Sequence, residues 1–281
     1  MTSLLILEWD ENSFKSKEEN GTGITKSLFL NQNGNYTRSN ALLDIFDNEA
    51  MIGDELQFKM LRTQHREMDI SKFMGKVAEY TVVYVCRKEK EINRHLSAIA
   101  RNGKYQSSFL DQYMAIGTGL NPTKNDKNLK EHYQPNDTQR DIVWVSIKDK
   151  KSLLVKPNFV GQFAGLQLKT SIYWRNIIDD LEKYKYPILY FDLNDDWEKL
   201  NKWIEQKKDT DENFKEVRLV EPTDEILYLK NIIKEHHKMI KALYDGKISI
   251  SYLIDYARDN LIVELAASFK IVTKTNIVMP N

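Results

Sequence analysis

Three side chains suited to phosphate chemistry lie near two apolar segments in the middle of the chain. Asp141 precedes residues 142–147, and Gln167 and Lys169 lie near the end of residues 162–169. Both segments are rich in apolar and β-branched residues and are separated by polar residues 148–152, which predicts two strands. Residues two apart on a strand point to one face, so adjacent pairing would gather a carboxylate, an amide oxygen and an ammonium. Such a set can hold a hard divalent cation and a phosphate.

Glu79 is a fourth candidate, since it is the only charged residue within residues 77–86. We expect residues 71–102 to form one long helix, from an N-cap at Ser71 to a stop at Asn102 and the glycine that follows it. The β-branched residues of 77–86 also leave a strand conceivable there. A carboxylate in such an apolar stretch is costly unless it is paired or bound to a metal. Two interpretations stay open: an ion pair with an Arg or Lys elsewhere, or a metal ligand.

The remaining middle of the chain predicts further elements in alternation. Residues 103–140 are polar and are expected to form a long loop, either a solvated insertion or a contact with DNA or a partner. A helix is expected at about 175–185, an apolar strand at 186–192 and a helix at 195–207. This order predicts an α/β fold with a mixed central sheet flanked by helices.

The two ends of the chain predict separate regions. Residues 1–65 are expected to be β-rich, with strands at 4–9, 27–30 and 55–61, and to act as an added sheet, a dimerisation element or a target-recognition module. Residues 208–281 are expected to form a helical region. Its first helix starts at Thr223 and stops at Asp245, its second spans about 251–269, and His236 and His237 are expected at the surface.

The middle region resembles the PD-(D/E)xK nuclease superfamily. The resemblance covers roughly residues 70–205 and rests on Asp141, a strand, a turn, a second strand and the tripeptide QLK at 167–169, preceded by a helix with GKVAE at 75–79. The nearest variant is the Q-x-K branch of Mrr-like restriction endonucleases, and the spacing of Asp137 and Asp141 is similar to a DUF4365-like subgroup. Asp137 is the less favoured alternative for the acidic position.

The resemblance implies a restriction-endonuclease-like core, assigned to residues 66–207, and a Mg²⁺-dependent deoxyribonuclease activity in restriction or anti-phage defence. It implies four catalytic residues, Asp141, Gln167, Lys169 and Glu79. Asp141, Glu79 and Gln167 would bind Mg²⁺, with Mn²⁺ as a substitute. Lys169 would orient the attacking water or stabilise the transition state. The partners implied are DNA and either a second copy of the chain or a partner defence subunit.

Composition neither requires nor excludes this function. The chain of 281 residues is 41% hydrophobic, which suits one large domain or a core with appendages. Lys and Arg total 41 and so do Asp and Glu, so positive charge for nucleic acid must be concentrated locally. Two other interpretations therefore stay open. One is a catalytically inactive nuclease-like fold that binds nucleic acid or serves assembly. The other is an unrelated α/β interaction protein in which Glu79, Asp141 and Lys169 form structural ion pairs.

Several other classes of site are not supported by the sequence. Cys86 is the only cysteine, which rules out an intramolecular disulfide and thiolate-rich zinc sites, and its apolar neighbours predict an inert thiol. We find no nucleophile elbow, Walker A loop, H-E-x-x-H or EF-hand pattern. The N-terminus lacks a basic leader and no apolar run is long enough to span a bilayer, so we expect a cytoplasmic protein without membrane contact.

Overall fold

The computed structural model describes residues 8–10, 13–15, 38–53, 57–60, 63, 65–103, 107–156 and 162–253. The chain divides into two compact units, Lys59–Lys247 and a second made of Met1–Phe58 with Ile248–Asn281. The larger unit contains α3 (Arg66–Lys88), α4 (Lys90–Ala100), η1 (Ser108–Gln112), β3 (Tyr113–Gly117), α5 (Asn121–Asn125), η2 (Lys130–His132), β4 (Ile142–Ser146), β5 (Gly165–Ser171), η4 (Trp174–Lys183), β6 (Ile188–Asp192), α6 (Trp197–Lys208), η5 (Glu212–Phe214) and α7 (Asp224–Tyr244).

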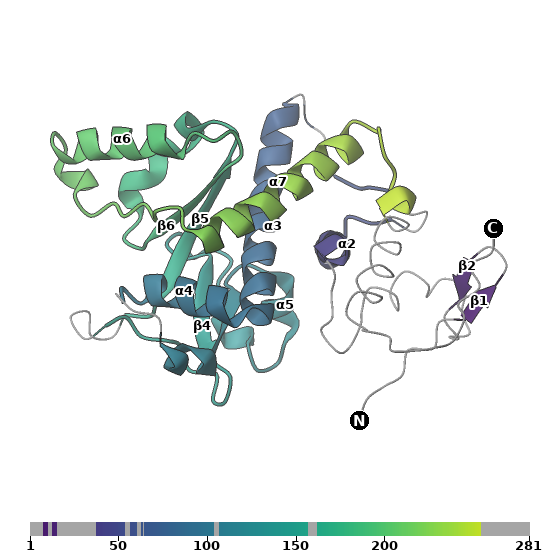
Figure 1. The fold of residues 1–281 in the computed structure, drawn as a ribbon, viewed down its shortest axis with the longest axis horizontal. Helices are drawn as coiled ribbons and strands as arrows, with labels where there is room; N and C mark the ends of the chain where they lie inside the picture. The colour runs from purple at the N-terminus through teal and green to yellow at the C-terminus, as the bar shows by residue number, and fades with distance from the viewer. Residues whose placement is uncertain are drawn as a thin grey trace, which may run out of the picture. The chain divides into compact units, whose positions relative to one another are not determined.

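The larger unit is built on a four-stranded mixed sheet in the order β3-β4-β5-β6, in which β4, β5 and β6 are labelled in Figure 1. β4 pairs antiparallel with both β3 and β5, whereas β5 pairs parallel with β6. A parallel pair needs a crossover connection, and the 3₁₀ helix η4 lies in that connection. The expected α/β class with a mixed sheet and flanking helices is confirmed, and β4, β5, β6 and α6 lie close to their predicted positions.

The sheet has two distinct faces. Trp144 of β4 is fully buried and its indole nitrogen donates to Asn93 of α4, so Trp144 marks the face that α4 covers. Neighbouring residues on a strand point to opposite faces, so Val143 and Val145 lie on the other face. Directly opposed residues share a face. The pairing of Val143 with Gly165 therefore puts Gln167 and Lys169, two and four residues further along β5, on the same face as Val143. We call this the site face.

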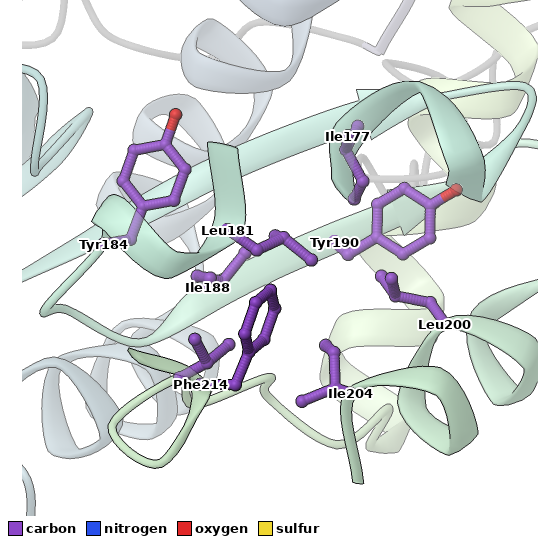
Figure 2. Packing of buried hydrophobic residues seen from close by; sticks show 9 residues of the cluster. Ile177, Leu181, Tyr184, Ile188, Tyr190, Leu200, Ile204 and Phe214 are labelled. Atoms are coloured by element: carbon purple, nitrogen blue, oxygen red, sulfur yellow. The ribbon is translucent and has the colours of Figure 1, made fainter. Parts of the chain in front are cut away.

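Two separate clusters cover parts of the site face. Val143 and Val145 pack with Ile116 of β3 and with Leu129, which precedes η2. A larger cluster joins η4, β6, α6 and η5 and is shown in Figure 2. Its buried members are Ile177, Leu181, Tyr184, Ile188, Tyr190, Leu200, Ile204, Phe214 and Val217. The part of the site face that carries Gln167 and Lys169 lies beside this larger cluster, since both residues pair in register with β6.

The single helix expected over residues 71–102 is two helices. The first, α3, starts at Arg66 instead of Ser71, and its chain turns extended at Glu89 before α4 begins. The early start follows from Asp69 in the first turn, whose carboxylate accepts the backbone N–H of Thr63 at 2.6 Å and the hydroxyl of Tyr244 at 2.8 Å. The break at Glu89 redirects the chain, so that α4 can place Asn93 against the sheet. The alternative strand at 77–86 is wrong.

The long irregular loop expected over residues 103–140 is only partly irregular. It contains the edge strand β3, whose five residues pair with β4 along their whole length. η1, α5 and η2 are also short helical turns within this stretch. The strand is short and lies between polar stretches, so its pattern is weak in the sequence and becomes clear only from its pairing with β4.

α7 has the limits that its capping residues predicted, with Thr223 at the N-cap and Asp245 at the C-cap. It crosses and packs against α3 (Figure 1). His236 is buried instead of exposed, because α7 turns this position toward the interior of the unit. No helix within the described residues is long and apolar enough to cross a membrane.

The smaller unit is described only in part. It contains a two-stranded ladder of β1 (Glu8–Asp10) and β2 (Ser13–Lys15) and the helix α2 (Arg38–Asn48). The helix was not part of the expected β-rich region. Phe46 of α2 packs against Phe58 at 5.0 Å between ring centroids. Of the predicted strands, 27–30 lies outside the described residues, and 55–61 is described only at 57–60, where Phe58 forms one isolated bridge. The second C-terminal helix is described only as far as residue 253.

Candidate functional site

The candidate site lies where β4 and β5 separate. The register of these strands ends at Ile142 and Leu166, and its continuation puts Asp141 directly opposite Gln167. The backbone N–H of Asp141 still donates to the carbonyl of Leu166 at 2.9 Å. β5 then continues as the parallel partner of β6. From this point the edge of β5 that faced β4 has no strand of the described chain beside it. The backbone groups along that edge therefore need side chains as hydrogen-bond partners.

The Asp141 carboxylate accepts a backbone hydrogen bond from β5 that a neighbouring strand would otherwise accept. Its Oδ2 atom accepts the backbone N–H of Leu168 at 2.7 Å and the side-chain amide of Gln167 at 2.6 Å. Its second oxygen, Oδ1, accepts no hydrogen bond from any residue that the structure describes. Asp141 and Gln167 are therefore brought together, as their spacing predicted.

The side chain of Gln167 is only partly hydrogen-bonded. It is buried, and its Oε1 atom has no hydrogen-bond partner among the described residues. Buried polar atoms are nearly always paired, so an unpaired one calls for an explanation. Exchanging the amide nitrogen and oxygen would place two acceptors, Oε1 and the Asp141 oxygen, against each other, which is favourable only with a proton or a cation between them.

These oxygens suit a small divalent cation. Mg²⁺ binds to proteins through one or two carboxylate or carbonyl oxygens and takes its other ligands from water and phosphate. Gln167 Oε1 is such an oxygen, buried without a partner among the described residues, and the Asp141 carboxylate is hydrogen-bonded to the same side-chain amide. Within the described ranges, no three His, Cys, Asp or Glu side chains lie close enough together to hold a metal. A magnesium ion here would take Asp141 and Gln167 as its protein ligands and its other ligands from solvent or substrate.

Lys169 lies next to this pair on the site face. Its ammonium donates to the hydroxyl of Tyr184 at 2.6 Å and lies 4.5 Å from the centre of that ring. Tyr184 belongs to the large apolar cluster, and its hydroxyl points away from the other labelled side chains (Figure 2). Lys169 is thus held by a rigid neighbour.

The pKa of Asp141 is raised to about 6, and burial is the largest cause of this rise. The hydrogen bond from the Leu168 N–H and the charges of Lys169 and Lys76 act in the opposite direction, and Asp137 adds to the rise. Lys169 and Lys76 are therefore both close enough to Asp141 to affect its charge. Burial therefore keeps the protonated form of Asp141 stable to a higher pH than in an exposed carboxyl group.

Glu79 is connected to the site through Lys76. The Lys76 ammonium lies 3.4 Å from Glu79 Oε2 and donates to the carbonyl of Gly119 at 3.0 Å. This is the ion pair that one of the two interpretations of Glu79 anticipated. Sequence reasoning gave Lys76 no role, although it lies three residues before Glu79, the spacing at which helical side chains meet.

Asp137, the alternative acidic position, is fully engaged elsewhere. Its carboxylate accepts from Arg140 Nε at 2.9 Å and Nη2 at 2.8 Å and from the backbone of Gln139. Arg140 in turn runs over β5 at Gly165, where a Cβ atom would lie 2.6 Å from its Cδ. Asp137 therefore positions an arginine beside the site.

A second polar cluster, which sequence reasoning missed, lies at the end of β6. Lys230 of α7 contacts Asp192 at 2.6 Å and Asp195 at 2.9 Å, and Lys234 contacts Asp195 at 2.8 Å. The two lysines lower the pKa of Asp195 to about 2 through their hydrogen bonds. The other oxygen of Asp192 caps α6 by accepting the Trp197 N–H at 3.0 Å. Every one of these charges is paired, so the cluster serves to join α7 to the sheet.

The expected inertness of Cys86 agrees with its environment. Its thiol is buried in α3, and burial raises its pKa far above the usual range. A thiol in this state is a poor nucleophile.

Comparisons of the chain with protein-family models, with curated proteins and with solved structures gave no match in any of the three.

Proposed function

We propose that the chain is a metal-dependent nuclease that hydrolyses phosphodiester bonds in DNA, in restriction or anti-phage defence. The observation that carries the proposal is the pairing of Asp141 with Gln167. In that pairing Gln167 Oε1 is buried without a partner among the described residues, and the Lys169 charge acts on Asp141. The order of helix, three strands, crossover and fourth strand supports the resemblance to the PD-(D/E)xK superfamily.

Each residue of the site has a role in this proposal. Asp141 and Gln167 would hold Mg²⁺ or Mn²⁺, and Glu79 would join them if Lys76 moved aside. When bound, such an ion polarises the scissile phosphate and lowers the pKa of a bound water. Lys169 would orient the water or donate to an oxygen on which negative charge develops, and Tyr184 would hold its ammonium in place.

Replacing Lys169 tests the proposal. We expect Lys169→Ala to lower the rate of plasmid cleavage in Mg²⁺ or Mn²⁺ by about 100-fold or more, because it removes a donor aimed at the developing charge. Conversion of supercoiled plasmid to nicked and linear forms measures the rate. Phage DNA serves as a second substrate.

The control for this substitution is Lys199→Ala, which removes the same charge from an exposed position of α6. It should cleave as fast as the native chain, and EDTA should stop cleavage by both. Metal-dependent cleavage that survives Lys169→Ala would contradict the assignment of the site.

A second function is favoured by the pairing within the site itself. Asp141 Oδ2 already has two donors, and Glu79 is paired with Lys76. A nuclease-like fold that binds nucleic acid or serves assembly without cleaving would have no need for a metal. In that case the native chain would bind DNA without cutting it, and Lys169→Ala would leave the affinity unchanged. A copy of the chain or a defence subunit would then be its partner.

A further inference from the structure

A cleft of about 470 Å³ opens on the site face. Val143, Leu154 and Phe163 form its apolar wall, and Lys150 and Lys151 lie along it. Small-molecule and nucleotide sites commonly have such volumes and combine apolar walls with a few polar groups. The cleft is thus large enough for a nucleotide.

Strand pairing makes the cleft continuous with the Asp141 site. Val145 is bridged to Ser152, and Leu154 to Phe163, so the alternation of side chains carries the site face across the hairpin. Val143, in the cleft wall, is two residues from Asp141, which is about 7 Å along a strand. Thr118 also lines the cleft, and its backbone N–H donates to the Asp141 carbonyl at 2.9 Å.

The wall of the cleft exposes large apolar side chains. Phe163 is 47% exposed and Leu154 is 50% exposed, although both are held by the hairpin pairing that joins them. An exposed aromatic ring is a surface on which a base can stack without regard to sequence. A base in a duplex offers only its edges, so only an unpaired base can stack on this ring.

Positive charge lies on the same wall. The Lys151 side chain is 82% exposed and its ammonium lies 3.4 Å from the exposed carboxylate of Asp149, while Lys150 donates to the carbonyl of Ile147 in its own turn. Arg140 also lines the cleft but is paired with Asp137, and Glu131 is the one carboxylate among the described residues that line the cleft. In the described part of the chain, Lys150 and Lys151 are held only by contacts within an exposed turn, and a phosphate backbone can replace such contacts.

We propose that the cleft binds an unpaired nucleotide of a single DNA strand, with its base on Phe163 and its phosphates toward Lys150 and Lys151. The strand would then continue along the site face to Asp141. The substrate of the site would be single-stranded DNA or a duplex with an unpaired segment, an inference that rests on the proposed nuclease function.

The test measures binding without cleavage. A fluorescein-labelled oligothymidylate of about 12 nucleotides is titrated with the full chain in EDTA and followed by fluorescence anisotropy. We expect Phe163→Ala to weaken binding about fivefold or more through the loss of stacking. Phe109→Ala is the matched control, because this phenylalanine is 42% exposed in η1 and does not line the cleft. Its affinity should equal that of the native chain.

The two lysines give an independent readout. For the variant with both Lys150→Ala and Lys151→Ala, the slope of log Kd against log salt concentration should be smaller than for the native chain. The expected difference is about 0.7 for each phosphate that these two lysines neutralise. Lys199→Ala should leave this slope unchanged.

Three results would overturn the proposal. The first is equal affinity of Phe163→Ala and the native chain for the labelled oligothymidylate. The second is a blunt duplex that competes as well as an unlabelled single strand, and the third is thymidine monophosphate that displaces the labelled strand at a concentration comparable with that of an unlabelled strand. The last would indicate a site for a free nucleotide. Binding that depends on Phe163 in a chain that cuts no DNA would support the cleft and reject the nuclease. Plasmid cleavage that depends on Lys169, with no effect of Phe163→Ala on strand binding, would reject the cleft alone.

Discussion

Asp141 is held in a state that combines burial with incomplete pairing. Its carboxylate replaces a missing strand partner by accepting the Leu168 N–H, yet one oxygen remains without a donor among the described residues. Burial makes the charged form costly, which is why the pKa rises in spite of two nearby lysines. A cation at this position would relieve that cost.

The raised pKa of Asp141 makes stability depend on pH. Between the ordinary value of 3.8 and about 6, the folded chain binds a proton that the unfolded chain has lost. The contribution of Asp141 to the free energy of unfolding therefore falls as pH rises through this window and is constant above it, with a total change of about 3 kcal/mol. Asp141→Asn removes the charge and should be more stable than the native chain at pH 8, with a smaller difference at pH 5. Urea unfolding at both pH values measures this.

Asp137→Asn is the control for that experiment. Its carboxylate is paired with Arg140 at 2.8 Å, so its replacement should destabilise the chain at both pH values. A stability difference between Asp141→Asn and the native chain that is the same at pH 5 and pH 8 would contradict the prediction.

At the scale of the elements, the side-chain amide of Asn93 hydrogen-bonds α4 to the sheet. Asn93 accepts from Trp144 Nε1 at 2.9 Å and donates to the Tyr113 carbonyl at 3.0 Å, so it links β4 and β3 to the helix. This contact explains why the helical segment breaks at Glu89: a continuous helix would carry Asn93 away from the sheet. The break therefore helps to hold the edge strand β3 in place.

Asn93→Ala should lower the free energy of unfolding by about 3 kcal/mol, because it removes the partner of the buried Trp144 indole N–H and that of the partly buried Tyr113 carbonyl. Asn128→Ala, at an exposed position after α5, should change stability by less than about 0.5 kcal/mol. Chemical unfolding at pH 7 gives both values. Equal stability of the two variants would show that the Asn93 contacts are not important for the fold.

At the scale of the whole molecule, α7 belongs with the sheet. It packs along α3, and Lys230 neutralises Asp192, which is only 3% exposed at the end of β6. The compact unit accordingly runs to Lys247, whereas the boundary at residue 207 stays a sequence-based prediction.

Two fragments test where the unit ends. We expect Lys59–Lys247 to unfold in one cooperative thermal transition. A fragment of residues 59–208 should lack this transition, because it leaves Asp192 as an unpaired buried charge and uncovers α3. Circular dichroism and calorimetry on both fragments measure the difference. A cooperative transition of the shorter fragment within about 5 °C of the longer one would place the boundary before α7.

The sequence by itself determined the elements whose signals are local. Alternating and continuous apolar runs marked β4, β5 and β6, and the caps at Thr223 and Asp245 marked α7. The same local patterns predicted that pairing of the two strands would bring Asp141 and Gln167 together, whereas the register that puts them opposite each other comes from the structure.

Only the tertiary structure decided the features that depend on distant partners. β3 is recognisable from its pairing with β4, and the end of α3 from the position that Asn93 must reach. Lys76 and Lys230 look like ordinary surface residues in the sequence, and their ion pairs arise from the folded arrangement around them. Local propensity carries no information on which charge lies across a sheet or beside a helix, since those distances are set by the packing of the whole unit.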